Sequence, residues 1–131
     1  MDTSQVANRM YTSDPVTIDG VAFDATWMQE NYWRLNPALT AQYLTDYEFK
    51  IPPHVELMAQ ELQDASNYPH RRLIITLPPR HGKSHLISHW FPVWFFQIFP
   101  GKRIILASYE ADTASMWGRK VRDAIVLHAK K

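Results

Sequence analysis

Apolar positions in the first half of the chain recur at helical spacing. Residues 24–34 place apolar side chains three and four positions apart, and in residues 37–47 Pro37 suits a first helical turn. Residues 53–65 repeat the spacing until an Asn-Tyr-Pro sequence ends it. These patterns predict a helical N-terminal region followed by an amphipathic helix.

The pattern changes beyond residue 70, where short apolar runs replace the helical spacing. Residues 71–77 and 102–108 each begin with two cations and continue with aliphatic residues, which is typical of buried strands. Residues 83–90 suit a helix that Pro92 must kink or restart, and residues 111–128 carry an apolar helical stripe. The order strand, helix, strand, helix predicts a parallel α/β unit.

Six aromatic residues crowd the segment between these two runs. They are Trp90, Phe91, Trp94, Phe95, Phe96 and Phe99. Such a cluster can stack on nucleic-acid bases or form a groove for a partner. Core packing is the favoured interpretation, because large aromatic side chains dominate protein cores.

The composition is that of a globular protein with a core. Of 131 residues, 46% are hydrophobic and 13% aromatic, which argues against a wholly disordered chain. The absence of cysteine excludes a disulfide scaffold, a cysteine zinc finger and a cysteine nucleophile. No segment reaches the ~18 apolar residues of a membrane span, and the N-terminus lacks the features of a secretory signal.

The net charge of +1 hides an uneven distribution. Residues 1–48 hold two basic and seven acidic residues, whereas residues 49–131 hold twelve basic and six acidic residues. Such asymmetry hints that the second half meets phosphate groups, although an ordinary mixed surface accounts for it equally well.

The sequence LIITLPPRHGKSHLIS carries the clearest chemical signal. Gly82 would let backbone amides approach an anion, and the following helix start would add free N–H groups. Lys83 would reach the terminal phosphates of a nucleotide, and the Ser84 hydroxyl would bind the Mg²⁺ that bridges them. The pattern therefore predicts a phosphate loop that binds ATP with Mg²⁺.

This match to the usual pattern G-x-x-x-x-G-K-[ST] is incomplete. Leu77 stands where the first glycine is expected, and the Gly-Lys-Ser tripeptide is common by chance. A solvated loop that merely contains a lysine stays open as an alternative. The strand predicted before the loop and the helix after it favour nucleotide binding.

The departure itself points to a family. LPPRHGKS, the aromatic segment ending in proline, the run IILASY and a helix with spaced arginines resemble the ATPase domain of phage terminase large subunits. The similar stretch runs from about residue 49 to 126. The resemblance implies an α/β fold, an incomplete P-loop NTPase with a parallel βαβ core over residues 49–131. A mainly helical, acidic leader over residues 1–48 would precede it.

The resemblance also assigns roles to single residues. Arg80 would touch the γ-phosphate, and Lys83 would join it in catalysis. Phe49 would stack on adenine and His54 would bond its edge, although a core role for Phe49 and a helix-capping role for His54 are slightly favoured. The full set expected to bind nucleotide is Phe49, His54, Pro79, Arg80, His81, Gly82, Lys83 and Ser84.

Candidate DNA contacts lie at the end of the second predicted strand and on the helix after it. They are Ser108, Tyr109, Arg119 and Arg122, with Lys120 beside them. Parallel sheets bind ligands at the carboxyl ends of their strands, and arginines bind phosphates. A solvated basic face explains the same residues equally well.

Histidines recur every four residues at His81, His85 and His89. Two histidines four apart on a helix can bind zinc. No acidic residue stands between His81 and Phe99, so a helix-surface role is favoured over a metal site.

The chain should lack steady ATP hydrolysis by itself. No apolar run ending Asp-Glu, which would hold Mg²⁺ and orient the attacking water, follows the loop. The resemblance therefore implies an incomplete packaging ATPase, without its Walker B and nuclease regions. It further implies double-stranded DNA, a small terminase subunit and a portal protein as partners, with no membrane, in the host cytoplasm. The open alternatives are a non-catalytic protein that binds DNA or a partner through its basic half, and a different P-loop enzyme.

Overall fold

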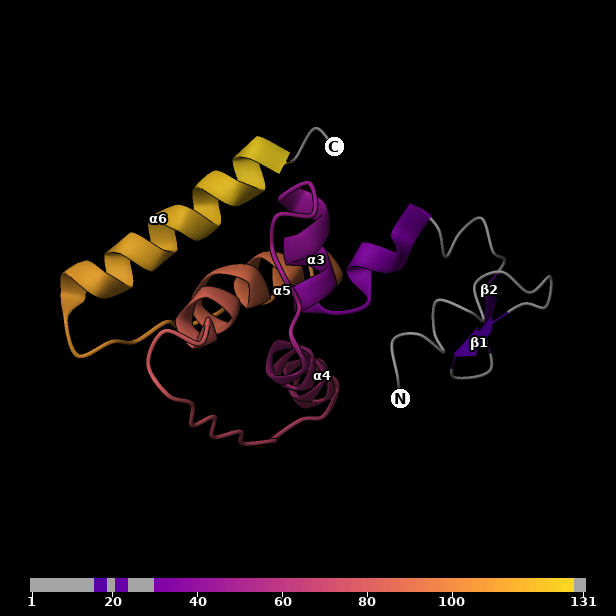
Figure 1. Ribbon diagram of the computed structural model, residues 1–131, viewed down its shortest axis with the longest axis horizontal. Coiled ribbons are helices and arrows are strands. Elements are labelled where there is room, and N and C mark those ends of the chain that lie inside the picture. The colour runs from indigo at the N-terminus through magenta and orange to yellow at the C-terminus, as the bar shows by residue number, and fades with distance from the viewer. Residues whose placement is uncertain (1–15, 19–20, 24–29, 129–131) are drawn as a thin grey trace. The chain divides into compact units, whose positions relative to one another are not determined.

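A computed structural model describes residues 16–18, 21–23 and 30–128 (Figure 1). The chain divides into two compact units, Met1–Tyr32 and Trp33–Lys131. In the first unit, strands β1 (Val16–Ile18) and β2 (Val21–Phe23) pair antiparallel as a two-stranded sheet. Most of the helix predicted over residues 24–34 lies outside the described residues, and its end forms a 3-10 turn, Tyr32–Arg34.

Within its described residues, the second unit contains four α-helices, of which α3 (Pro37–Leu44) comes first. The Asn36 side-chain oxygen accepts hydrogen bonds from the backbone N–H groups of Ala38 and Leu39, both at 3.0 Å. These two bonds satisfy amides that the helix itself leaves unpaired, and Pro37 has no N–H to satisfy. The predicted start of this helix at Pro37 is confirmed.

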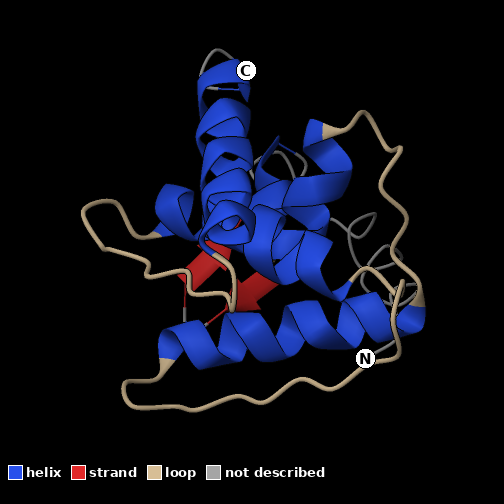
Figure 2. Cartoon of the chain, turned by 90° about the vertical axis from the view of Figure 1, so that its left-hand side faces the viewer, coloured by secondary structure: helices blue, strands red, loops and turns tan. Residues whose placement is uncertain are grey.

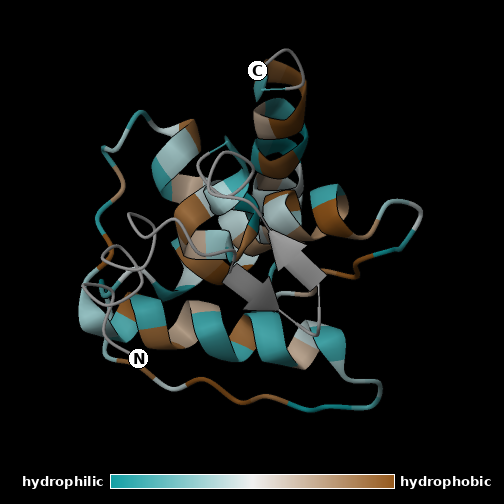
Figure 3. Cartoon of the chain, turned by 90° about the vertical axis from the view of Figure 1, so that its right-hand side faces the viewer, coloured by the Kyte–Doolittle hydropathy of each residue, from teal (hydrophilic) through white to brown (hydrophobic). Residues whose placement is uncertain are grey.

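Helices α4 (Pro53–Asn67) and α6 (Ala111–His128) match the predicted amphipathic helices. In α4, Val55, Met58 and Leu62 are buried at helical spacing, and in α6 Val121 and Ala124 are buried. Hydrophilic and hydrophobic residues alternate along both helices (Figure 3). Each helix therefore buries one stripe and leaves the other face in water.

The aromatic segment forms one helical run with a widened turn in it. A π-helical turn, His85–Trp90, leads directly into α5 (Phe91–Ile98). The Phe91 N–H donates to the Leu86 carbonyl five residues back, because Pro92 has no N–H with which to continue the regular ladder. Pro92, which was expected to kink or restart the helix, follows a widened turn through which the helical run continues into α5.

The core of the second unit lies where this run meets α3, α4 and α6. Leu86, Val93, Ala41 and Ala59 are fully enclosed, and Trp94 donates its indole N–H to the Arg34 carbonyl at 2.7 Å. Of the six aromatic residues, the two tryptophans are buried and the four phenylalanines are half-buried, so the core role favoured from the sequence holds for Trp90 and Trp94.

The α/β fold class predicted from the sequence is wrong. Residues 71–78 and 102–108 are both drawn as loop in Figure 2, and within the described residues the single sheet is β1–β2. Neither segment pairs with another segment as a strand, so the parallel βαβ core does not form. The second unit is a helical structure in which these two segments run as connections.

Candidate functional site

The Pro-Pro-Arg-His-Gly loop turns sharply before the helical run that begins at Lys83. Arg80 and Gly82 both adopt left-handed backbone conformations, with φ of 64° and 79°. A side chain at Gly82 would meet no atom within 4 Å, so glycine is required there by backbone conformation and not by space. For Arg80 the same conformation costs about 1 kcal/mol, which the surrounding contacts must offset.

Two histidines supply those contacts. His81 Nδ1 lies 2.9 Å from the Pro79 carbonyl, and His54 Nε2 lies 3.2 Å from the His81 carbonyl. Because carbonyl oxygens only accept, both ring nitrogens must carry the proton and donate it. His54, at the start of α4, therefore holds the loop backbone in place. This differs from both roles weighed for it from the sequence.

The cations of the loop are open to a ligand. Arg80 is exposed and Lys83 is half-buried, and neither forms an ion pair with the described residues. A cavity of about 350 Å³ is lined by residues 77–85, including Pro79 and Ser84, and no carboxylate lines it. The arrangement presents positive charge without a competing anion, which suits a phosphate group.

A second hollow of about 530 Å³ adjoins the loop cavity. Arg80, His81 and Gly82 line both, so the two spaces share a wall. His85 also lines both spaces, whereas Phe49, His54 and Trp90 line only the second hollow. Every residue of the predicted nucleotide-binding set therefore lines one of the two spaces.

Two of the lining residues were missed in the sequence. Trp90 was assigned to the core and His85 to the helix surface. The Trp90 indole N–H is buried and has no hydrogen-bond partner in the described part of the chain. Phe49 packs edge-on against Trp90 at 6.4 Å between ring centroids. His85 and Trp90 follow Gly82 by about one and two helical turns. This spacing could have indicated from the sequence that they lie near the loop.

The histidine series forms no metal site. Within the described residues, no group of three His, Asp or Glu side chains converges on a point where an ion could sit. Burial lowers the pKa of His85, and Lys120 lowers it further. Burial lowers the pKa of His89 to about 4, with His85 and Lys120 contributing. His89 is therefore a neutral ring that stacks on Trp90, with centroids 4.3 Å apart.

The candidate DNA contacts do not line either space beside the loop. Ser108 and Tyr109 lie exposed in the bend before α6, where the Tyr109 side chain is 96% accessible. Arg119 is exposed, whereas the Arg122 guanidinium donates to the Asp123 carboxylate at 2.7 Å. Its pairing with Asp123 leaves Arg122 a weaker candidate for binding phosphate than Arg119.

No helix within the described residues is long and apolar enough to cross a membrane. Comparisons of the chain with family models, curated proteins and solved structures found no match.

Proposed function

We propose that the loop over residues 78–84 binds the phosphates of a nucleotide, and that ATP with Mg²⁺ is the ligand. The observation that carries the proposal is the pair of unpaired cations, Arg80 and Lys83, on a cavity without carboxylates. Lys83 binds phosphate as a point charge, and Arg80 reaches the terminal phosphate from its turn. The Ser84 hydroxyl fits a Mg²⁺ ion carried by the phosphates, whose oxygens supply the other ligands.

The adjoining hollow suits the base. It offers the flat rings of Phe49 and His85, and Trp90 forms part of its lining. Its volume of about 530 Å³ lies in the range of small-molecule sites.

A binding measurement tests the proposal directly. A fluorescent ATP analogue is titrated with Mg²⁺ into wild type, Lys83→Ala and the control Lys102→Ala, which removes an exposed cation outside both cavities. We expect Lys83→Ala to bind at least about tenfold more weakly, as loss of one charge-assisted contact costs about 1.5–3 kcal/mol. Equal binding by all three proteins would refute the site.

The resemblance to terminase large subunits supports a finer proposal, an ATP-binding part of a DNA-packaging motor. Mg²⁺-dependent turnover by this chain alone is expected to be absent, since no carboxylate lines the loop cavity to orient water. A robust rate that Lys83→Ala abolishes would contradict that expectation.

The exposed cation Arg119 favours a second candidate, a non-catalytic protein that binds DNA through its basic half. This candidate would be favoured if the chain binds duplex DNA, if Arg119→Ala weakens that binding, and if the chain does not bind the ATP analogue.

A further inference from the structure

Residues 102–108 have the conformation of a strand without a neighbour. The Lys102 N–H donates to the Phe99 carbonyl at 3.2 Å, and beyond it residues 103–108 make no backbone hydrogen bond within the described chain. Ile104 and Leu106 are half-buried, whereas Ile105 between them is 93% exposed. Alternation of this kind is the pattern of a strand with one packed face.

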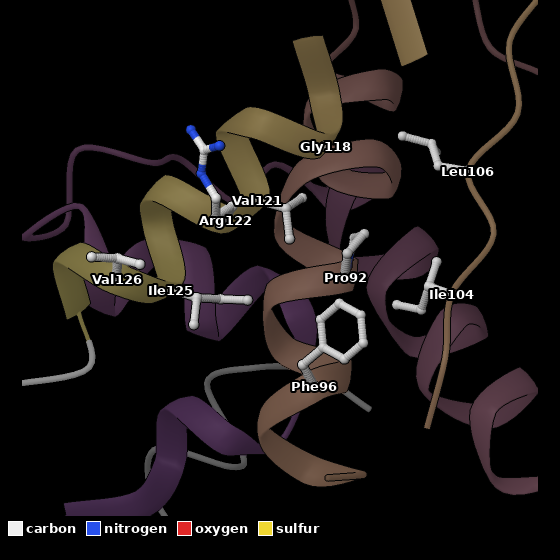
Figure 4. Close-up of a pocket in the computed structure, with 9 residues that line it drawn as sticks. All are labelled: Pro92, Phe96, Ile104, Leu106, Gly118, Val121, Arg122, Ile125 and Val126. Carbon is white, nitrogen blue, oxygen red and sulfur yellow. The ribbon is translucent and has the colours of Figure 1, made fainter. Parts of the chain in front are cut away.

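An apolar groove of about 340 Å³ runs along this segment. Figure 4 shows Ile104 and Leu106 directed toward Pro92 and Phe96 of α5, with Ile125 of α6 across the open space. The segment forms one wall of the groove, and the two helices form the floor and the opposite wall. An unpaired backbone edge thus borders a row of aliphatic side chains.

The charges around the groove are positive. Lys102 and Arg103, at the start of the segment, are exposed and form no ion pair with the described residues. Arg122 lines the groove, but its guanidinium points away from Phe96 in Figure 4 and pairs with Asp123. The groove therefore offers an apolar surface to a ligand. The unpaired positive charges of Lys102 and Arg103 lie at one end of the segment.

We propose that residues 103–107 form an edge to which an extended segment of another polypeptide adds as a strand. The incoming strand pairs with the free backbone groups and places alternate aliphatic side chains over Pro92 and Phe96. A carboxylate at its end meets Lys102 and Arg103. A second copy added in parallel is disfavoured, because it would bring its own two cations beside Lys102 and Arg103. A small apolar molecule would leave the backbone edge unpaired.

The probe is a labelled peptide of alternating valine and threonine with glutamates at both ends, matched in length to the segment. Fluorescence anisotropy measures its binding to the full chain, and hydrogen exchange locates it. We expect the amides of residues 103–107 to exchange at least about tenfold more slowly with peptide bound, as new ladder bonds protect them. Residues 73–77 are the other run without a strand partner, and their amides test whether the peptide selects residues 103–107. They should be unaffected, because the groove over Pro92 and Phe96 does not border them.

Two matched pairs separate the contributions. Ile104→Ala removes a groove wall and should weaken binding about fivefold or more, whereas Ile105→Ala removes an exposed side chain and should change it less. The same peptide with alternate backbone nitrogens methylated cannot form the ladder and should not bind. Exchanging its glutamates for lysines should weaken binding, because like charges then meet.

Three outcomes would overturn the proposal. Equal binding of the methylated and unmethylated peptides would show that the groove binds apolar side chains without strand addition. Protection confined to residues 73–77 would place the edge elsewhere. Sedimentation showing that the chain pairs with itself through residues 103–107 would make a second copy the occupant. If Ile104→Ala fails to fold, as judged by circular dichroism, the exchange experiment on wild type still tests the proposal.

Discussion

Replacing His89 by phenylalanine tests whether burial of an uncharged imidazole shapes the pH dependence of stability. Burial chiefly lowers the pKa of His89 from 6.5 to about 4, and the nearby His85 and Lys120 contribute. The ring stacks on Trp90, so a phenyl ring of similar shape can take its place.

The sign follows from proton binding. At pH 7 His89 is neutral in the folded and largely neutral in the unfolded chain. Between pH 6.5 and 4 the unfolded chain binds a proton that the folded chain does not, so stability falls as the pH falls through this window. From pH 7 to 5 a fully shielded ring would lose about 2 kcal/mol, and halving this for the half-exposed site leaves about 1 kcal/mol.

Urea unfolding at pH 7 and pH 5 measures the difference. We expect the wild type to lose about 1 kcal/mol more than His89→Phe between the two pH values, because the variant has no proton to bind at this position. Parallel losses in the two proteins would refute the assigned burial of the neutral ring. A variant that is markedly less stable at both pH values would show that the phenyl ring does not fit against Trp90.

Three further substitutions test the packing, a buried hydrogen bond and the loop. Leu86→Ala, at a fully enclosed core position, should cost about 2–5 kcal/mol in urea unfolding. Thr40→Val removes a buried hydroxyl that donates at 2.7 Å to the backbone carbonyl of the 3-10 turn. It should cost about 1–3 kcal/mol, whereas Thr76→Val in an exposed position should cost little. Gly82→Ala should cost about 1 kcal/mol through its left-handed backbone alone, measured by thermal unfolding, since nothing crowds the site.

The helices could be read from the sequence because their causes are local. Pro37 and Pro53 begin α3 and α4, and α6 spans Ala111–His128 as predicted. The turn at Gly82 was likewise local, because its left-handed backbone favours glycine. Pro92 has no N–H, so the sequence predicted that it would disturb the helix. The widened turn before it was visible only in the structure.

The candidate site was partly visible in the sequence. Lys83 and Ser84 follow from the Gly-Lys-Ser pattern, but the place of His54 does not, since its bond to the His81 carbonyl joins residues 27 positions apart. Trp90 belongs to the aromatic run by sequence, and only the packing of Phe49 against it brings both beside the loop. Such contacts depend on how helices meet, which the local pattern does not encode.

By itself, the sequence determined where the chain coils, where it turns and which runs are extended. In residues 71–77 and 102–108, half-buried aliphatic side chains alternate with exposed ones. This alternation fits an extended backbone, but not the buried strands that the sequence predicted. Whether such runs become a sheet was decided by the tertiary structure, because a strand exists only where a second backbone lies within hydrogen-bonding distance. A helix satisfies its backbone hydrogen bonds within one segment, so the local sequence could specify it. A sheet needs a second strand, and residues 71–77 and 102–108 do not pair with each other.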